Sequence, residues 1–124
     1  MSSRSENPFE SIRRRLREFA AARDWDQFHS PKNLAMALIV EAAELVEQFQ
    51  WLSQAESQSL APARRTAVEQ ELADIQIYLI RLADRLEIDL EHAVDAKLEI
   101  NARKYPADQV RGSAEKYDAR DDGG

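Results

Sequence analysis

Cysteine is absent from this chain of 124 residues, which excludes disulfides and thiolate metal sites. The absence is consistent with a reducing compartment. No apolar run approaches the roughly 18 residues that a membrane span requires, and the first ten residues contain no apolar core of the kind found in signal peptides. We therefore expect a soluble, cytoplasmic protein without a membrane partner.

Basic residues and turn-forming residues are also scarce. Lys and Arg number 17 against 23 Asp and Glu, which gives a formal net charge of −6. Such a chain is a poor general binder of nucleic-acid polymers, whose phosphates need clustered Lys and Arg. A small phosphate ligand is still compatible, because a metal ion can supply the positive charge. With 3 Gly and 4 Pro, the chain has few residues for the tight turns of a sheet-rich fold.

Helix-start signals and the helical spacing of apolar residues predict an all-α fold. Asn7 and Ser30 each precede a proline, a combination that begins many helices, and Asp89 can cap a later helix. We expect four main helices in an antiparallel bundle, at residues 8 to about 23, 31 to about 52, 63 to 86 and 90 to about 105. Residues 53–62 form a polar connector in this prediction. The catalytic domain is expected to span 1–106 and a mobile C-terminal tail 107–124.

The two central predicted helices each carry apolar residues on two sides. The main core stripe includes Leu34 on the first of these helices and Val68, Leu72 and Leu86 on the second. The second stripe consists of Met36, Val40 and Ala43 on one helix and Ala73, Ile77 and Ile80 on the other. A helix that is apolar on two sides needs two partners. One interpretation is a homo-oligomer in which the central helices pair across an interface, which the frequency of symmetric oligomers favours. The other is a monomer whose first and last helices cover these faces.

Two acid pairs with the same spacing lie on the central helices. Glu41 and Glu44 are three residues apart on one helix, and Glu71 and Asp74 are three apart on the next, so each pair shares one helix face beside the core stripe. Antiparallel packing would bring four carboxylates together, where they would repel unless a cation lay between them. Carboxylate oxygens are ligands for Mg²⁺ or Mn²⁺. The alternative is ordinary solvated acids, and the pattern alone leaves the two interpretations about equal.

Several other residues are candidates for nucleotide contacts, each with a structural alternative. Lys97 and Asn101 fall among apolar positions, where they would contact phosphate, sugar or base, or else be a snorkelling Lys and a hydrogen-bonded core Asn. Trp25 and Trp51 flank the second helix and would stack on a nucleobase, although packing is the commoner use. Tyr78 lies one turn beyond the second acid pair, on the carboxylate side.

The two histidines and the basic residues near the last helix end are weaker candidates. His29 would donate to a phosphate or base, but a lone loop histidine is more often structural. Arg103 and Lys104 are more often surface charges near a helix C-terminus. A di-iron carboxylate bundle requires Glu-x-x-His, and neither His29 nor His92 follows a Glu by three residues. That class of site is therefore disfavoured.

Five segments together resemble the MazG-type all-α nucleotide pyrophosphohydrolases, and within them the dCTP pyrophosphatase group. The E-x-x-E and E-x-x-D pattern of this superfamily corresponds to the two acid pairs. The matching segments are RDWDQFHSPKNL (23–34), EAAELVEQFQW (41–51), ELADIQIYL (71–79), the K-x-x-x-N-x-x-K-Y-P series (97–106) and RGSAEKY (111–117). The resemblance covers nearly the whole chain.

The resemblance implies a fold, a reaction and a set of site residues. It implies a helical protein that dimerises through its central helices, often into a homotetramer, and that acts in nucleotide-pool house-cleaning. It implies hydrolysis of a deoxynucleoside triphosphate, dCTP or a modified dCTP, to the monophosphate and pyrophosphate. By position, Glu41, Glu44, Glu71 and Asp74 would be the catalytic Mg²⁺ ligands (Mn²⁺ is possible). The substrate-binding residues would be Trp25, His29, Trp51, Tyr78, Lys97, Asn101, Arg103, Lys104 and Tyr105.

The resemblance leaves three questions about the reaction. Leu16 stands where mammalian members have a pocket histidine, so dUTP or a damaged nucleotide is an alternative substrate. A non-catalytic helical oligomer that binds nucleotides is an alternative of another class. For the hydrolase, Glu44 is a candidate acceptor of the proton of the attacking water, and the tail with RGSAEKY is hypothesised to close over a site.

Overall fold

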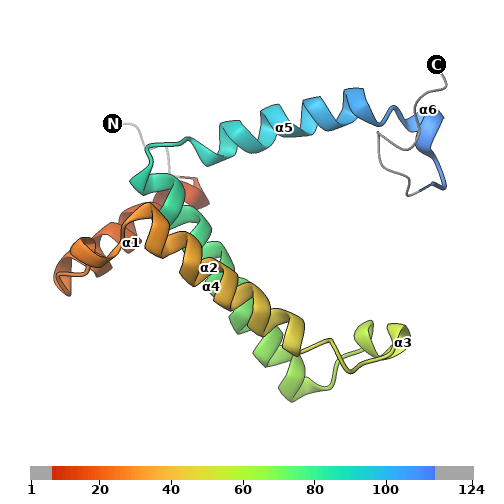
Figure 1. The fold of residues 1–124 in the computed structure, drawn as a ribbon, viewed down its shortest axis with the longest axis horizontal. Coiled ribbons are helices and arrows are strands. Elements are labelled where there is room, and N and C mark those ends of the chain that lie inside the picture. Colours follow the sequence, from red (N-terminus) through yellow and green to blue (C-terminus); the bar gives the residue numbers. More distant parts are fainter. Residues whose placement is uncertain (1–6, 114–124) are drawn as a thin grey trace. The chain divides into compact units, whose positions relative to one another are not determined.

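A computed structural model of the chain describes residues 7–113, which contain helices and no strands. The elements in chain order are α1 (Pro8–Ala22), the short 3-10 helix η1 (Asp26–Phe28), α2 (Pro31–Glu47), α3 (Gln54–Ser57), α4 (Pro62–Arg85), α5 (Leu90–Lys104) and α6 (Ala107–Val110). The α-helices are labelled in Figure 1. The chain divides into two compact units, residues 1–88 and residues 89–124. None of the described helices is both long enough and apolar enough to cross a bilayer. The all-α prediction is thus confirmed.

Three of the four predicted helix starts are formed by side-chain caps. Asn7 accepts a hydrogen bond from the backbone N–H of Glu10 at 2.9 Å, with Pro8 as the first residue of α1. Ser30 accepts from the N–H of Asn33 at 3.1 Å in the same way. Asp89 caps α5. Such caps satisfy N–H groups that the first helical turn leaves without a partner, which is why sequence alone locates them.

The second helix ends earlier than predicted, at Glu47 instead of near residue 52. The guanidinium of Arg64, from the start of α4, donates to the carbonyl oxygen of Gln48 at 2.6 Å. The next residues turn, and the backbone N–H groups of Gln48 and Phe49 bond carbonyls three residues back. A cation on the last carbonyls of a helix stabilises its end. The predicted polar connector then contains α3, which begins with a capping box between Ser53 and Glu56.

The first unit is built on the antiparallel packing of α2 along α4, with α1 against α4. Its buried apolar residues are Ala20, Leu34, Val68, Ile80 and Ala83. Leu34 and Val68 belong to the predicted core stripes. Leu72 and Leu86, which were also predicted to face inward, are about half exposed, because α2 and α1 leave the edges of α4 uncovered.

The second predicted apolar stripe is exposed on α2 and partly buried on α4. Met36 and Val40 on α2 are 56% and 53% exposed, as a face without a partner in the chain would be. Ile80 on α4 is buried within the single chain, so this end of the stripe is covered by other parts of the same chain. The stripe on α2 remains an apolar surface, and the predicted pairing of central helices between subunits stays a prediction.

The second unit contains α5 and α6. α5 ends at Lys104, where the N–H of Tyr105 bonds the carbonyl oxygen of Asn101 at 2.9 Å just before Pro106, as the proline predicts. Residues 107–110, placed by the sequence in a tail, form the short helix α6. The RGSAEKY segment extends beyond the described residues, and the proposed domain boundary at residue 106 stays a prediction.

Candidate metal and nucleotide site

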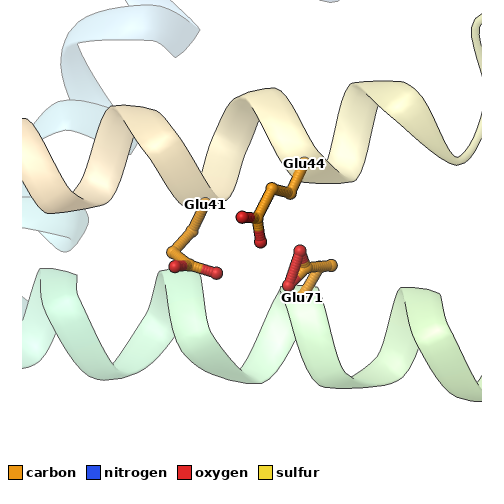
Figure 2. A group of neighbouring side chains, drawn as sticks. All are labelled: Glu41, Glu44 and Glu71. Atoms are coloured by element: carbon orange, nitrogen blue, oxygen red, sulfur yellow. The ribbon is translucent and has the colours of Figure 1, made fainter.

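Three of the four predicted acids converge between the central helices. Glu41 and Glu44 extend from α2 toward Glu71 on α4, and one carboxylate oxygen of each lies within 4.8 Å of the other two (Figure 2). The spacing of three residues puts the α2 pair on one face, and the antiparallel packing places Glu71 opposite it. Oxygens on opposite sides of a Mg²⁺ ion are about 4.2 Å apart. The cluster therefore has nearly the dimensions of a cation site.

Hydrogen bonding, burial and like charges raise the pKa values of two of these acids. The pKa of Glu71 is raised from 4.5 to about 7, chiefly by a side-chain hydrogen bond with Glu44, and further by burial and by the charges of Glu44 and Glu41. The pKa of Glu41 is also raised, first by burial and then by the charges of Glu44 and Asp74. A hydrogen bond between two carboxyl groups requires a proton on one of them. Without a cation, Glu71 is thus about half protonated near pH 7.

Asp74 lies at the side of this cluster and not within the group of three. Its charge raises the pKa of Glu41, and together with Glu41 it contributes to the raised pKa of Tyr78, whose largest cause is burial. Asp74 also lines a neighbouring cavity. This acid therefore stands where the carboxylate cluster meets the cavity.

The cavity has a volume of about 530 Å³, within the range of small-molecule sites. Of the predicted substrate-binding residues, Trp25, His29 and Tyr78 line it. Trp25 meets the ring of His29 edge-on, with centroids 6.3 Å apart. Leu16 from α1 lines the same cavity, so the departure from the family pattern occurs at its wall. The first unit alone thus combines a carboxylate cluster with an aromatic cavity.

The other predicted substrate-binding residues are not brought to this cavity by the first unit. Trp51 is 86% exposed in the turn after α2 and does not line the cavity with Trp25. The remaining five residues belong to the second unit, namely Lys97, Asn101, Arg103, Lys104 and Tyr105. Their role in substrate binding stays a prediction.

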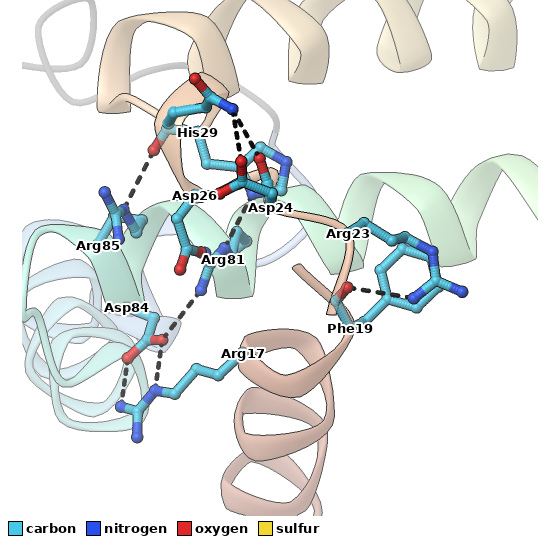
Figure 3. Close-up of polar contacts among 10 residues, drawn as sticks. Arg17, Phe19, Arg23, Asp24, Asp26, His29, Arg81, Asp84 and Arg85 are labelled. Carbon is cyan, nitrogen blue, oxygen red and sulfur yellow. Dashed lines mark hydrogen bonds and ion pairs between the residues drawn. The ribbon is translucent and has the colours of Figure 1, made fainter. Parts of the chain in front are cut away.

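Sequence reasoning missed a buried cation beside the cavity. Arg81 on α4 is 4% exposed and pairs with Asp26 at 2.6 Å, while its Nε lies 3.1 Å from Nδ1 of His29 (Figure 3). The available signal was an arginine at position i+4 from Ile77, inside an apolar stripe, where an unpaired charge would be costly. Its partners come from a loop more than 50 residues away, which periodicity does not reveal.

A second missed feature is the carboxylate of Asp84, one turn further along α4. Arg17 from α1 forms two hydrogen bonds with it, at 2.8 and 2.6 Å. The pKa of Asp84 is lowered, first by the hydrogen bond with Arg17 and then by the charges of Arg17, Arg13 and Arg81, against an opposing effect of burial. This bidentate pair ties α1 to α4 beneath the cavity wall.

Comparison with known proteins gives consistent matches. The model of the MazG-like family matches residues 36–119. The chain is 50% identical to dCTP pyrophosphatase 1 of Rattus norvegicus and 49% identical to that of Homo sapiens, over 90% of this chain and 67% of each relative. A solved structure of a pyrophosphatase from Archaeoglobus fulgidus is similar with a TM-score of 0.78 and 42% identity, over 86% of this chain and 99% of that one.

Proposed function

The chain belongs to the MazG-like family, and from that premise we propose that it is a divalent-cation-dependent hydrolase that converts dCTP or a modified dCTP to the monophosphate and pyrophosphate. The names of its relatives support a nucleoside triphosphate pyrophosphohydrolase. The observation that carries the proposal is that the Glu41, Glu44 and Glu71 carboxylates on α2 and α4 lie in the same unit as an aromatic cavity, which is lined by residues of α1, the segment before α2, the start of α2, and α4.

The donor set fits a hard divalent cation. All three converging ligands are carboxylates, which suit Mg²⁺ or Mn²⁺ and do not favour softer metals. The pKa of Glu71 is raised chiefly by its hydrogen bond with Glu44 and that of Glu41 chiefly by burial, and neighbouring negative charges contribute to both shifts. In the proposal Glu41, Glu44 and Glu71 hold the ion, and Asp74 completes the ligand set from the cavity side.

The proposed reaction is an in-line displacement at the α-phosphorus. The bound cation supplies Lewis-acid polarisation of the phosphate. A water oxygen forms a bond to the α-phosphorus, the bond from that phosphorus to the bridging α–β oxygen breaks, and pyrophosphate leaves. Glu44 is proposed to accept the proton of the water, since it is an acid of the cluster that would lie beside the bound cation. Trp25 and Tyr78 are proposed to hold the base in the cavity.

Phosphate and sugar contacts are assigned to the second unit in this proposal. Lys97 would neutralise the leaving pyrophosphate, while Asn101 and Tyr105 would bond the sugar or phosphates. Arg103 and Lys104 would add positive charge nearby, and Trp51 would close the base pocket. The proposal includes self-association as a dimer or a dimer of dimers, a cytoplasmic location, and no nucleic-acid polymer as partner.

The residue Leu16 in the cavity wall supports a second candidate substrate. Leu16 lines the cavity and has no hydrogen-bonding group with which to select a base edge. A cavity wall of this kind discriminates weakly among similar pyrimidines, by roughly 10 to 200-fold at best. Hydrolysis of dUTP or of a damaged nucleotide is therefore the second candidate.

A substrate panel tests the proposed function. The purified chain is incubated with each of the four standard dNTPs, dUTP and 5-modified dCTP, with Mg²⁺ or with EDTA, and pyrophosphate and monophosphate are quantified. We expect both products in equal amounts, only with Mg²⁺, and dCTP or a modified dCTP at the highest kcat/KM. Release of inorganic phosphate, or nucleotide binding without products, would contradict the reaction; a preference for dUTP would move the assignment to the second candidate.

The affinity for Mg²⁺ is expected to rise with pH and to reach its plateau above about 7. Glu71 has a folded-state pKa raised to about 7, so below that pH a proton occupies the cluster and competes with the cation. The affinity should fall about tenfold for each pH unit below that value, because one proton is exchanged for one ion. Calorimetric titrations in buffers of different ionisation enthalpy measure the proton release. Glu69→Gln, which changes an exposed acid of α4, should behave like the wild type; a pH-independent affinity would contradict the idea.

A further inference from the structure

The guanidinium of Arg81 has its geometry fixed by three partners. One terminal nitrogen lies 2.6 Å from the carboxylate of Asp26, and the other lies 3.7 Å from that of Asp84. The third donor, Nε, points at Nδ1 of His29 at 3.1 Å (Figure 3). A cation that is only 4% exposed needs such pairing, because an unpaired buried charge is strongly unfavourable.

The direction of the contact with His29 follows from the chemistry of arginine. A guanidinium has donors only and is not deprotonated in proteins. Nδ1 of His29 must therefore be the acceptor, and a ring nitrogen that accepts carries no hydrogen. In the neutral imidazole the hydrogen then resides on Nε2. Within the described part of the chain Nε2 has no hydrogen-bond partner, and His29 lines the cavity.

From this geometry we propose that Arg81 is a positioning residue that holds His29 in the Nε2–H form, so that the imidazole offers one fixed hydrogen-bond donor to an acceptor atom of the bound nucleobase. The inference rests on the proposed function, because it takes the ligand of the cavity to be a nucleotide. Cytosine presents adjacent acceptors at N3 and O2, whereas N3 of uracil carries a hydrogen. A donor facing that edge thus fits cytosine and supplies polarity that Leu16 lacks.

The charged groups around the imidazole keep it in this form. His29 is a loop residue, and Arg85 of α4 donates to its backbone carbonyl at 3.2 Å. The pKa of His29 is lowered, first by burial and then by the charge of Arg81, with a further contribution from Arg85 and an opposing one from Asp26. The other charged or titratable groups that line the cavity are Arg15 from α1 and Asp74 and Tyr78 from α4. The ring therefore stays neutral at physiological pH, which the donor role requires.

Nitrogen NMR of the full chain with labelled histidine tests the tautomer directly. We expect the His29 signals of the wild type to report a protonated Nε2 and an unprotonated Nδ1. In Arg81→Met they should report a mixture of tautomers and a higher pKa, since a positive charge has been removed and Asp26 remains. A wild-type ring protonated on Nδ1 would overturn the proposal. Arg81→Lys, which keeps the charge for Asp26, serves the same test if Arg81→Met does not fold.

Kinetics with dCTP distinguish positioning from structural support. His29→Phe and Arg81→Met should each raise KM by about tenfold with kcat nearly unchanged, because a contact made equally in ground and transition states acts on KM alone. In the His29→Phe background, Arg81→Met should add less than about twofold. Equal losses of kcat in both backgrounds, or an unchanged KM in His29→Phe, would overturn the proposal. A wild type that hydrolyses no dNTP would refute the proposed function instead, and the tautomer would still be measured.

Discussion

Replacing Glu41 by glutamine is expected to abolish turnover while the helical fold persists. Glutamine has nearly the same shape but lacks the charge and one of the two metal-binding oxygens, so the cation loses a strong ligand from the cluster of three. A loss of about 10³-fold or more in kcat/KM is expected, which corresponds to roughly 4 kcal/mol of transition-state stabilisation. The measurement is pyrophosphate release at saturating Mg²⁺.

Thermal unfolding separates this loss from misfolding. Because the pKa of Glu41 is raised by burial and by like charges, its carboxylate is unfavourable in the metal-free protein. Glu41→Gln should therefore melt at or above the wild-type temperature in EDTA and gain little from added Mg²⁺. Glu69→Gln is the matched control, since it removes an exposed acid whose ion pair within the described residues is with Arg65 at 3.7 Å, an interaction typically worth less than about 1 kcal/mol. Activity of Glu41→Gln within tenfold of the wild type would refute the metal role.

Asp74 permits a sharper version of the same experiment, because it borders both the cluster and the cavity. If Asp74 is the fourth ligand, Asp74→Asn should lose turnover as Glu41→Gln does, for every dNTP. If it instead contacts the base, Asp74→Asn should retain turnover and change the order of substrates in the panel. The proposed function predicts the first result. The second would leave three metal-binding acids and assign Asp74 to base recognition.

The features that sequence predicted well are set by neighbouring residues. Each of the caps Asn7, Ser30 and Asp89 accepts a hydrogen bond from the backbone N–H three residues further along the chain. Local sequence is therefore enough to predict these caps. The acid pairs share a face because of helix geometry alone. The convergence of three of these four acids, Glu41, Glu44 and Glu71, required one further assumption, the antiparallel packing of two long apolar helices, which the structure contains.

The features that sequence missed depend on residues far apart in the chain. At the end of α2 the carbonyl of Gln48 accepts a hydrogen bond from Arg64, 16 residues further along the chain, and Trp51 lies exposed in the turn that follows. Arg81 and His29 are 52 residues apart in the chain, and the sequence around either residue does not predict their contact. Helical periodicity predicts the helix face on which a residue lies, but it does not identify the polar group on the neighbouring element that the residue contacts. Polar pairs between residues far apart in the chain can be identified only in the folded structure.

Replacing Ile39 by glutamate is expected to dissociate the protein into poorly stable monomers. Ile39 is 66% exposed, and the apolar face of α2 to which it belongs also contains Met36, Val40, Ala43 and Val46. Contiguous apolar surface of this kind marks an interaction site. Within the described residues the buried apolar side chains are five, two of them alanines, which is a small core for a chain of this length. We therefore expect that a second copy covers this face and contributes much of the stability.

In a two-fold symmetric dimer each substitution acts twice, which makes the effect of Ile39→Glu large. Burying an isoleucine contributes roughly 1.5–3 kcal/mol, so the loss of two corresponds to roughly 10² to 10⁴-fold weaker association before the cost of burying the charge. Light scattering after gel filtration and the concentration dependence of Tm measure it. Ala22→Glu, on the exposed side of α1, adds the same charge and should leave both unchanged. A wild type that is monomeric at micromolar concentration and melts at the same temperature as Ile39→Glu would contradict the interface, because the single chain would then be stable with this apolar face in water.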